Sequence, residues 1–511
     1  MVWPLAPTSA AGPELAAMVA AQAATIARQA AGITALEATV AAQAEVIAAQ
    51  AARIAELEAR LATTSRTSSK PPSSDGYAKP TRSRRERSGR RPGKQPGAPG
   101  AHLARVGEPD EVVVHAPERC QACGADLADA PVVGVEARQV FDLPPMRLVA
   151  TEHRGERRRC ACGQVTVGAF PGAVRAPAQY GPGVRALVAY LCCHQHLPYD
   201  RCAQLLADCL GAPVAAGSLA TMVAECAGGL DGVLATIREQ LKAASVVHVD
   251  ETGARVAGRL HWVHSASTDE LTLYTVHAKR GVAAMDAAGV LPGFAGVAVH
   301  DGWAPYWRYD AATHALCNAH HLRELDAVAE TPGQGWAAGM AELLVDAKRA
   351  VQRAVDAGAD CLEPAVAARL RQRYDRLLAD GHRANPPQGP ALRRRGRAPR
   401  SKAANLLARL DARRDQVLRF VTDFRVPFDN NLAERDLRMV KLHEKISGCW
   451  RSAAGAEAFL AVRGYISTAR KQRVGVLGTL RRVVEGNPWV PAAAGSCAHR
   501  AGALVAHTGG P

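Results

Sequence analysis

Two features common in exported and membrane proteins are missing from this sequence of 511 residues. No apolar run reaches the ~18 residues that a membrane-spanning helix needs. The first basic residue is Arg28, so the charged start of a secretory signal is absent. We therefore expect a cytoplasmic protein with no membrane partner. Its 13 cysteines would stay reduced there, and closely spaced pairs then indicate metal sites rather than disulfides.

Acidic residues are too few to balance the basic ones. Lys and Arg number 63 against 48 Asp and Glu, which gives a formal net charge of +15. Such an excess suits a polyanionic partner, either nucleic acid or an acidic membrane surface, although it also serves solubility. The length favours three or four folding units.

Residues 14–62 carry a heptad repeat that predicts a coiled coil. Two seams alternate by three and four residues, as a and d positions do. The a seam is Val19, Ile26, Ile33, Val40, Ile47, Ile54 and Leu61, and the d seam is Leu15, Gln22, Gln29, Leu36, Gln43, Gln50 and Leu57. β-Branched a residues favour two strands and hence a homo-oligomer, and four Gln weaken the d seam. One long helix docked on its own domain is the alternative.

Residues 63–107 are rich in Ser, Pro, Gly and Arg and have little to bury, which predicts a disordered basic linker. A basic cluster within it could lie along DNA phosphates. Its members are Arg82, Arg84, Arg85, Arg87, Arg90, Arg91 and Lys94.

Residues 108–175 are expected to form short strands around two cysteine pairs. Cys120 and Cys123 lie in "CQAC", Cys160 and Cys162 lie in "CAC", and each pair is followed by Gly. Four thiolates in two chelating pairs suit tetrahedral zinc, although the second pair is shorter than the usual C-x₂₋₄-C. Four unligated cysteines are the alternative.

Residues 180–230 are predicted to be a helix-turn-helix-like region. Pro198 begins one helix, Gly211 ends it, and Ser218 is a plausible N-cap for the next. An ordinary helical hairpin has the same pattern. We interpret Cys192, Cys193, His194 and His196 as one face of a core helix rather than a second metal site.

From residue 243 the pattern is strand, strand, strand, helix, strand, helix, with the first three strands as an antiparallel meander. This is the order of a ribonuclease-H-like core. We assign residues 243–333 to its first part, 334–425 to a basic helical insertion, 426–488 to its last part and 489–511 to a tail. The fold class is therefore α+β and α/β, multidomain.

Three acids are candidates for one metal site. Asp250, in "SVVHVDETGARV", and Asp301, in "VAVHDGWAPY", are expected to end the first and fourth strands, which lie side by side in such a sheet. Glu434 lies one turn into a late helix. Carboxylates suit Mg²⁺ or Mn²⁺, and two ions about 3.5–4 Å apart can drive phosphodiester cleavage and strand transfer. Singly, Asp301 could merely start a turn.

Glu434 also has two ordinary interpretations, a capping box with Asn431 and an ion pair with Arg438. Asp436 is an alternative acid, and Glu251 is expected to be a turn or supporting residue. Arg438, Lys441 and Lys445 follow Glu434 near helical spacing and could contact DNA phosphates. Cys317 and His320 form a C-x₂-H pair that is more often structural than metal-binding.

The chain resembles the insertion-sequence-66 family of DDE transposases. The resemblance is carried by "SSKPPSSDG", "CQACGADL" with "CACG", "VVHVDETGARV", "VAVHDGWAPYW", "ALCNAHHLREL" and "VPFDNNLAERDLRMVK". It implies a ribonuclease-H-like core in which Asp250, Asp301 and Glu434 are the catalytic triad. It also implies zinc on Cys120, Cys123, Cys160 and Cys162, a helix-turn-helix, and accessory proteins of the same element as partners. "HDGWAPYW" and "CNAHHLREL" differ from the commoner family wording, which indicates a divergent subgroup.

These features together predict a DDE-type DNA transposase in the bacterial cytoplasm, associated with the nucleoid. It would bind the ends of an insertion sequence and perform metal-dependent strand cleavage and strand transfer. Two rival hypotheses remain: a non-catalytic zinc and helix-turn-helix DNA-binding regulator, and a ribonuclease-H-like nuclease that cuts without joining.

Overall fold

The computed structural model describes residues 11–61, 93–94, 97, 103–144, 146–386 and 401–492. The chain divides into two compact units, which we describe separately. The larger contains Pro80–Asn318, Val351–Leu362 and Arg413–Pro511, and the smaller contains Met1–Lys79, Ala319–Ala350 and Glu363–Ala412. Within the described ranges no single helix is long and apolar enough to cross a bilayer, although the bent pair of helices at residues 216–242 passes the length and composition test together.

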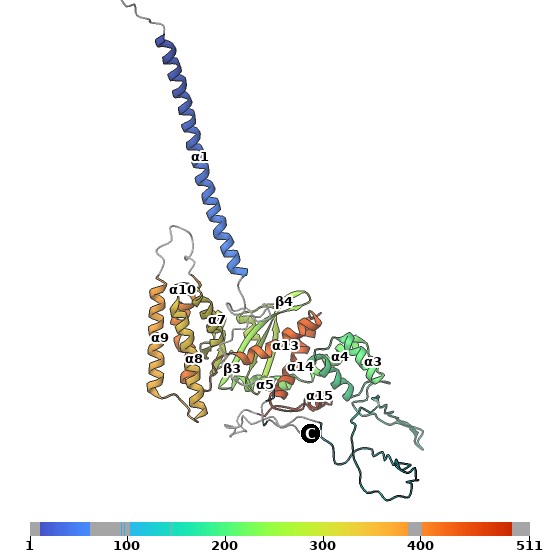
Figure 1. The fold of residues 1–511 in the computed structure, drawn as a ribbon. Coiled ribbons are helices and arrows are strands. Elements are labelled where there is room, and N and C mark those ends of the chain that lie inside the picture. Colours follow the sequence, from blue (N-terminus) through green and yellow to red (C-terminus); the bar gives the residue numbers. More distant parts are fainter. Residues whose placement is uncertain are drawn as a thin grey trace, which may run out of the picture. The chain divides into compact units, whose positions relative to one another are not determined.

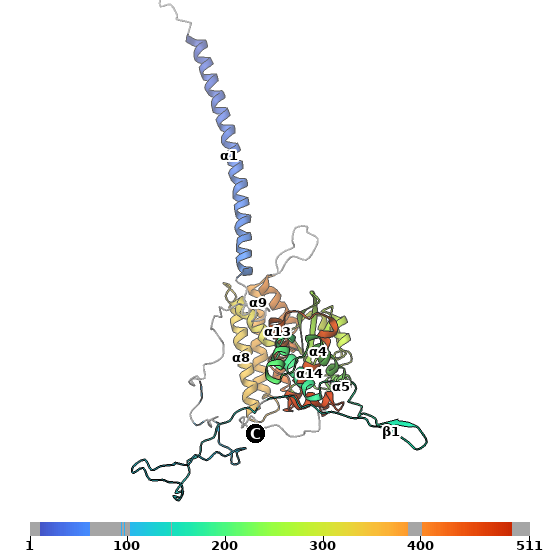
Figure 2. The ribbon, with the colours of Figure 1, turned by 90° about the vertical axis from the view of Figure 1, so that its right-hand side faces the viewer.

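The N-terminal part of the described chain is one continuous helix. This helix, α1 (Ala11–Leu61), contains every heptad position of the two predicted seams. Figures 1 and 2 show it without a break or kink. The apolar seam residues from Leu15 to Ile54 are exposed.

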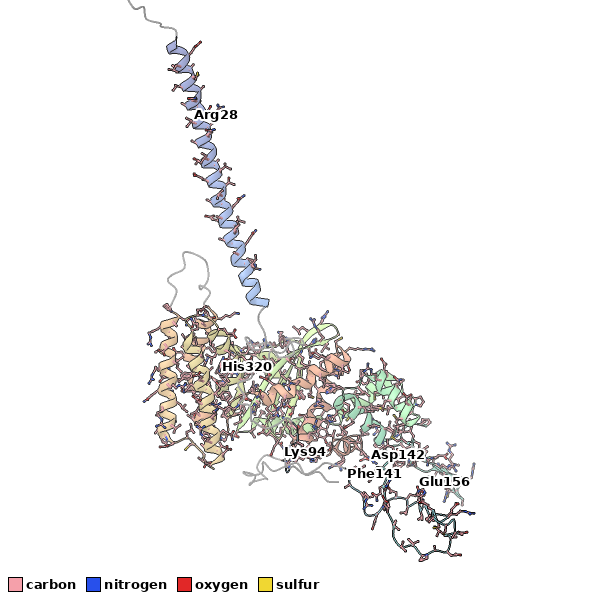
Figure 3. The ribbon with its side chains drawn as sticks, viewed as in Figure 1. Arg28, Lys94, Phe141, Asp142, Glu156 and His320 are labelled. Atoms are coloured by element: carbon pink, nitrogen blue, oxygen red, sulfur yellow. The ribbon has the colours of Figure 1, made fainter. Side chains whose placement is uncertain are left out.

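Residues 103–181 contain little regular structure. The expected set of short strands is reduced to one hairpin, β1 (Arg157–Arg159) and β2 (Val165–Val167), paired antiparallel. Large apolar side chains in this part are exposed, among them Phe141 (Figure 3). Too few apolar residues are buried here for this region to have a hydrophobic core of its own.

The larger unit is built on one five-stranded sheet, whose strands appear in Figure 1. Its strands are β3 (Val246–Val256), β4 (Arg259–Ser267), β5 (Thr272–His277), β6 (Val297–His300) and β7 (Thr313–Leu316). The spatial order is β5-β4-β3-β6-β7. The first three strands are antiparallel neighbours, and β6 joins β3 in parallel, followed by β7 in parallel. The expected meander and the adjacency of the first and fourth strands are both present.

Helices surround this sheet and form a separate bundle in the smaller unit. The larger unit contains α2 (Pro182–Ala189), a π-helical turn (Tyr190–His194), α3 (Tyr199–Leu210), α4 (Ala216–Gly228), α5 (Asp231–Lys242), α6 (Val282–Ala288), a 3₁₀ turn (Ala304–Arg308), α11 (Arg414–Val417), α12 (Arg419–Thr422), α13 (Asn431–Ser447), α14 (Ala453–Lys471) and α15 (Val476–Val484). The remaining helices are α7 (Asn318–Ala329), α8 (Gly335–Asp356), α9 (Pro364–Ala384) and α10 (Lys402–Ala412).

Two local expectations about helix and strand ends were wrong. Ser218 does not cap α4, because the helix already starts at Ala216, with Ala215 at the N-cap. Asp250 does not end its strand: β3 continues to Val256 because its antiparallel partner β4 keeps pairing with it after β6 has stopped. By contrast, Pro198 and Gly211 do flank α3, and Gly211 adopts the left-handed conformation of a helix C-cap.

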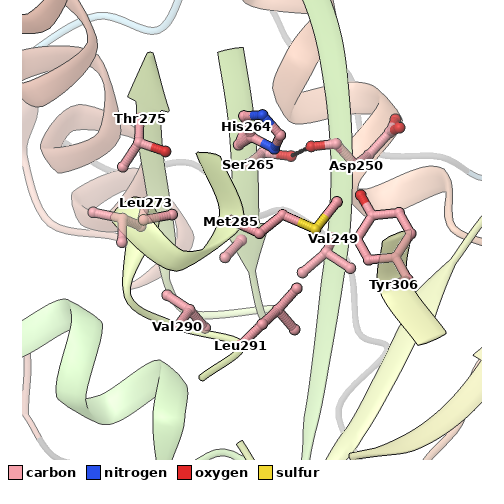
Figure 4. A pocket seen from close by; sticks show the side chains of 12 residues that line it. Val249, Asp250, His264, Ser265, Leu273, Thr275, Met285, Val290, Leu291 and Tyr306 are labelled. Carbon is pink, nitrogen blue, oxygen red and sulfur yellow. Dashed lines mark hydrogen bonds between the residues drawn. The ribbon is translucent and has the colours of Figure 1, made fainter. Parts of the chain in front are cut away.

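The two faces of the sheet are covered by different helices. Asp250 pairs with Ser265 and Ser265 with Tyr274, so these three share one face, and the Tyr274 hydroxyl donates to a backbone carbonyl of α13. Side chains alternate along a strand, so Val249 and Glu251 face the other side. On that side Val249 packs near Met285 of α6 (Figure 4). The sheet therefore presents the candidate aspartate to α13.

Candidate active site

Strand register brings the two candidate aspartates together. In the parallel pair of β3 and β6, His248 lies opposite Val299. Asp250 and Asp301 each lie two residues further along, so they reach the same level and start from the same face. Both side chains remain partly accessible. The sequence alone predicted the adjacent strands, and the register adds the matched height.

One asparagine attaches α13 to this part of the sheet. The buried Asn430, at the N-cap of α13, donates from Nδ2 to the Val249 carbonyl at 2.9 Å. Its Oδ1 lies 2.8 Å from His248 Nδ1, which must therefore be the protonated ring nitrogen. The Asn430 backbone N–H donates to Cys317 Sγ at 3.1 Å. Glu434 lies one helical turn after Asn430, so these contacts also bring Glu434 to the face of the sheet that carries the two aspartates.

The pKa of Asp250 is consistent with the presence of other acids nearby. Burial and the neighbouring carboxylates of Glu251, Asp301 and Glu434 raise the pKa of Asp250 well above its usual value. Like charges at such close range oppose ionisation, and a bound divalent cation would reverse that effect. Accessible carboxylate oxygens are also the donors that Mg²⁺ and Mn²⁺ prefer. The donor set therefore suits a magnesium-type site by its chemistry, although the three carboxylates do not all lie within 4.8 Å of one another in the described chain.

Glu251 has a different environment from its neighbour Asp250. Its side chain is only 1% exposed, and its Oε1 accepts two hydrogen bonds from Arg280, at 2.9 and 2.7 Å. Its other oxygen accepts from the buried Tyr306 hydroxyl. The Arg280 guanidinium stacks over Trp303 at 3.9 Å and Trp262 at 4.7 Å. Glu251 thus anchors an arginine beside the site, a role that the sequence analysis did not identify.

The turn after β6 fixes Asp301. Asp301 Oδ1 accepts a hydrogen bond of 2.8 Å from the Trp303 N–H, so the residue does start a turn, as its ordinary interpretation required. The preceding His300 is buried, and its ring lies 3.0 Å from His314. Burial lowers the pKa of His300 to about 3, so this pair is neutral and structural. The turn and the acid role are compatible, because only one carboxylate oxygen takes part in this bond.

The contacts of α13 test the capping box predicted for Asn431 and the alternative acid Asp436. Asn430 rather than Asn431 is the N-cap, so the expected capping box is not formed. Asp436 is buried and pairs with Lys471 at 2.8 Å, which identifies it as a structural acid. Glu434 remains the partly accessible acid in the first turn of α13.

The three basic residues proposed for DNA on α13 differ in their contacts. Lys441 donates to the Gly253 carbonyl and pairs with Glu444 at 2.8 Å, and Glu444 also accepts from the Arg255 N–H. Lys441 therefore links α13 to β3. Arg438 and Lys445 are exposed. The six arginines of the predicted linker cluster lie outside the described residues, and Lys94 is exposed.

The two cysteine pairs form similar turns. Gly124 N–H donates to Cys120 O and Gly163 N–H to Cys160 O, both at 2.9 Å, and both glycines have a left-handed φ. Backbone N–H groups of Cys123 and Ala122 lower the pKa of Cys120, and that of Cys162 lowers the pKa of Cys160. Amides directed at sulfur favour thiolate ligands. No three of these four sulfur atoms lie within 4.8 Å of one another in the described chain.

The predicted core role of the neighbouring cysteines is consistent with their burial. Cys192 and Cys193 are buried in the hydrophobic core of the larger unit. The hydrogen-bonded neighbour Cys202 and burial raise the pKa of Cys192 far above its usual value, so it stays a neutral thiol. His194 instead lies 3.0 Å from the buried Arg463.

Two cavities lie beside β3, and of these only the smaller includes Asp250. On the α6 face the cavity below Tyr306 holds only about 20 Å³, room for about one water molecule, and is lined largely by apolar side chains (Figure 4). A larger cleft of about 600 Å³ lies at the start of β3, where His248, Arg425 and Arg435 line it, and none of the three candidate acids does.

Comparison with known families identifies the chain. Residues 177–458 match the model described as "Transposase IS66 family", which covers more than half of the sequence. This chain belongs to the IS66 transposase family. Residues 117–163 match the zinc-finger binding domain of transposase IS66 and include all four cysteines of the two turns. Residues 19–104 match a family of unknown function, DUF6444, and no curated protein matches the chain.

The family assignment therefore establishes an IS66 transposase with a zinc-finger-type domain, which supports structural zinc and DNA binding. The transposase model spans Asp250, Asp301 and Glu434 together with Asn430, Glu251 and Arg280.

Proposed function

We propose that this IS66 transposase is a DDE-type enzyme whose catalytic acids are Asp250, Asp301 and Glu434. The observation that carries the proposal is the attachment of α13 to β3 through Asn430, opposite the end of β6. This contact unites three acids from distant parts of the chain. The strand order β5-β4-β3-β6-β7 is that of a ribonuclease-H-like core, which supports the same assignment.

Each acid has a distinct position relative to the substrate. Asp250, at the centre of the sheet, is close to both other acids and would be shared between two metal ions. Asp301 and Glu434 would each hold one ion, from the β6 turn and from α13. Two bound ions of the magnesium type activate an attacking oxygen and stabilise the leaving oxygen of a phosphodiester. The acids orient those charges, and water or a DNA 3′-hydroxyl is the nucleophile.

Other parts of the chain would hold DNA. Zinc on Cys120, Cys123, Cys160 and Cys162 would join the two turns into one rigid element. The zinc-finger domain, helices α3 and α4 as a helix-turn-helix, the linker arginines and the exposed Arg438 and Lys445 would contact the ends of the insertion sequence. Phosphate contacts would dominate affinity, so binding should weaken steeply with salt.

The experiment compares wild type with Asp250→Asn. The substrates are a labelled duplex carrying the inverted repeats that flank the gene and a target plasmid, with Mg²⁺ or Mn²⁺. We expect wild type to cut and join the labelled end, and Asp250→Asn to bind the duplex with unchanged salt dependence but yield no product. Asp436→Asn, on the same helix as Glu434, is the control for a structural acid and should retain chemistry where it folds.

The rival functions predict different products. Equal behaviour of wild type and Asp250→Asn, with binding and no cleavage, would identify a DNA-binding regulator. Cleaved ends without joined product would identify a nuclease. Joined product that requires Asp250 is the result that only a transposase gives.

A further inference from the structure

The exposed seam of α1 carries enough information to say how it is covered. Eight large apolar seam residues of α1 are 55–67% exposed: Leu15, Val19, Ile26, Ile33, Leu36, Val40, Ile47 and Ile54. Figure 3 shows side chains standing out along most of its length. A helix with this much exposed apolar surface requires a partner. We infer that the partner is α1 of a second copy of the chain, lying parallel and in register.

A surface groove on α1 has the shape that such a partner needs. It is lined by Ile33, Leu36, Glu37 and Val40, together with two alanines. These four residues occupy consecutive a, d, e and a positions, which form the hole that receives one side chain from a facing helix. Leu36 of the second copy, at the same height, is the matching knob.

The glutamines decide the direction of the partner. In a parallel pair each d residue faces the same residue of the partner, so Gln22, Gln29, Gln43 and Gln50 would each face its own copy. Two amides can then hydrogen-bond across the seam. In an antiparallel pair with full overlap, a residues face d residues, which sets Ile26 against Gln50 and Ile33 against Gln43. Each amide would then be buried against an aliphatic side chain without a partner.

Charge and register agree with the parallel arrangement. At the centre of the antiparallel pair Glu37 would face Glu37 of the other copy, whereas in the parallel pair its neighbour across the seam is Gly32. A parallel slip by one heptad would set Leu36 against Gln29 or Gln43. Only the parallel, in-register arrangement places every described seam residue opposite the same residue of the second copy.

The consequence for function rests on the proposed transposase activity. In a parallel pair both chains leave α1 at the Leu61 end, so two zinc-finger domains and two catalytic units start from one point. An enzyme that joins two element ends to one target needs two such units together. An antiparallel pair would place their starting points at opposite ends of a 51-residue helix, about 75 Å apart.

Charge-swapped variants of the full chain test the inference without cysteine chemistry. We expect Gln22→Lys alone and Gln22→Glu alone to weaken self-association at least about tenfold, because like charges meet in the seam. Mixing the two should restore it, measured by sedimentation equilibrium and by co-purification of differently tagged chains. The matched control mixes Gln22→Lys with Ile54→Glu, which would meet only in the antiparallel pair and should stay weak.

The outcomes separate the inference from the proposed function. Restoration by Gln22→Lys with Ile54→Glu, but not by the Gln22 pair, would overturn the parallel direction. A wild-type chain that stays monomeric while it joins DNA ends would overturn the pairing and leave the catalytic proposal intact. A parallel dimer that never cuts DNA would overturn the catalytic proposal and leave the pairing intact.

Discussion

Asn430 is the residue whose replacement tests the proposed site most directly. Asn430→Ala removes the hydrogen bonds from Nδ2 to the Val249 carbonyl and from His248 Nδ1 to Oδ1. Both partners are buried, and each buried group left unpaired costs about 1–3 kcal/mol. The free energy of unfolding should therefore fall by roughly 2–6 kcal/mol. Glu434, one turn further along α13, should also lose its fixed position relative to Asp250.

The expected loss of activity exceeds what lower stability alone would cause. A displacement of about 1 Å at a catalytic group lowers the rate on the order of 100-fold. Strand cleavage by Asn430→Ala should fall by at least that factor at a temperature where the variant is folded. A higher Mg²⁺ concentration should also be needed for half-maximal cleavage, because one acid is displaced.

A matched control separates position from stability. Thr468→Val removes a buried hydroxyl that accepts from the Thr272 N–H at 3.0 Å and donates to the Thr272 carbonyl at 3.3 Å. It thus also leaves two buried groups unpaired, between α14 and β5. Urea unfolding should show similar losses for both variants, whereas only Asn430→Ala should lose cleavage. Equal activity of the two variants at equal stability would refute the positioning role of Asn430.

Three further predictions concern charge and metal. Because the folded-state pKa of Asp250 is raised, the metal-free chain should lose stability as pH rises from about 4 through that pKa. In urea unfolding with EDTA, Asp250→Asn should make the free energy of unfolding depend less on pH. An unchanged pH dependence would contradict the prediction. Purified chain should contain about one zinc per copy by elemental analysis, and Cys160→Ser should release it; a zinc content unaffected by that change would exclude the cysteine site. Arg438→Ala and Lys445→Ala should each lower the slope of log K against log salt for duplex binding by about 0.9, whereas Lys441→Ala should lower stability instead; a reduced slope for Lys441→Ala alone would reverse this assignment.

The sequence predicted the strand order because the relevant signals are local. Each strand is a short run of apolar residues, and most runs are followed by turn residues. The order of strands and helices along the chain restricts the possible topologies. The position of Glu434 on a helix followed from its spacing as well. The end of β3 was wrong because strand length depends on β4, a partner that no local pattern within β3 specifies.

The contacts that fix the site could not be predicted in the same way. Asn430 meets His248 across 182 residues of sequence, and Arg280 meets Glu251 across 29. The consecutive residues Asp429, Asn430 and Asn431 were a visible signal as part of the motif "VPFDNNLAERDLRMVK", but the motif did not indicate which of them bonds to the sheet. Which of them would turn inward depends on where α13 lies against the sheet, and that depends on tertiary packing.

The two adjacent acids of β3 show how one strand serves two purposes. Because alternate residues face opposite sides, Asp250 faces α13, while Glu251 faces α6. Both oxygens of Glu251 accept hydrogen bonds, from Arg280 and from Tyr306, and its side chain is buried. Asp250 has carboxylate neighbours rather than cations, an arrangement that is unfavourable in the empty protein. Such unrelieved repulsion is expected where a cation is part of the working state, so the acid that destabilises the metal-free fold is the one we assign to chemistry.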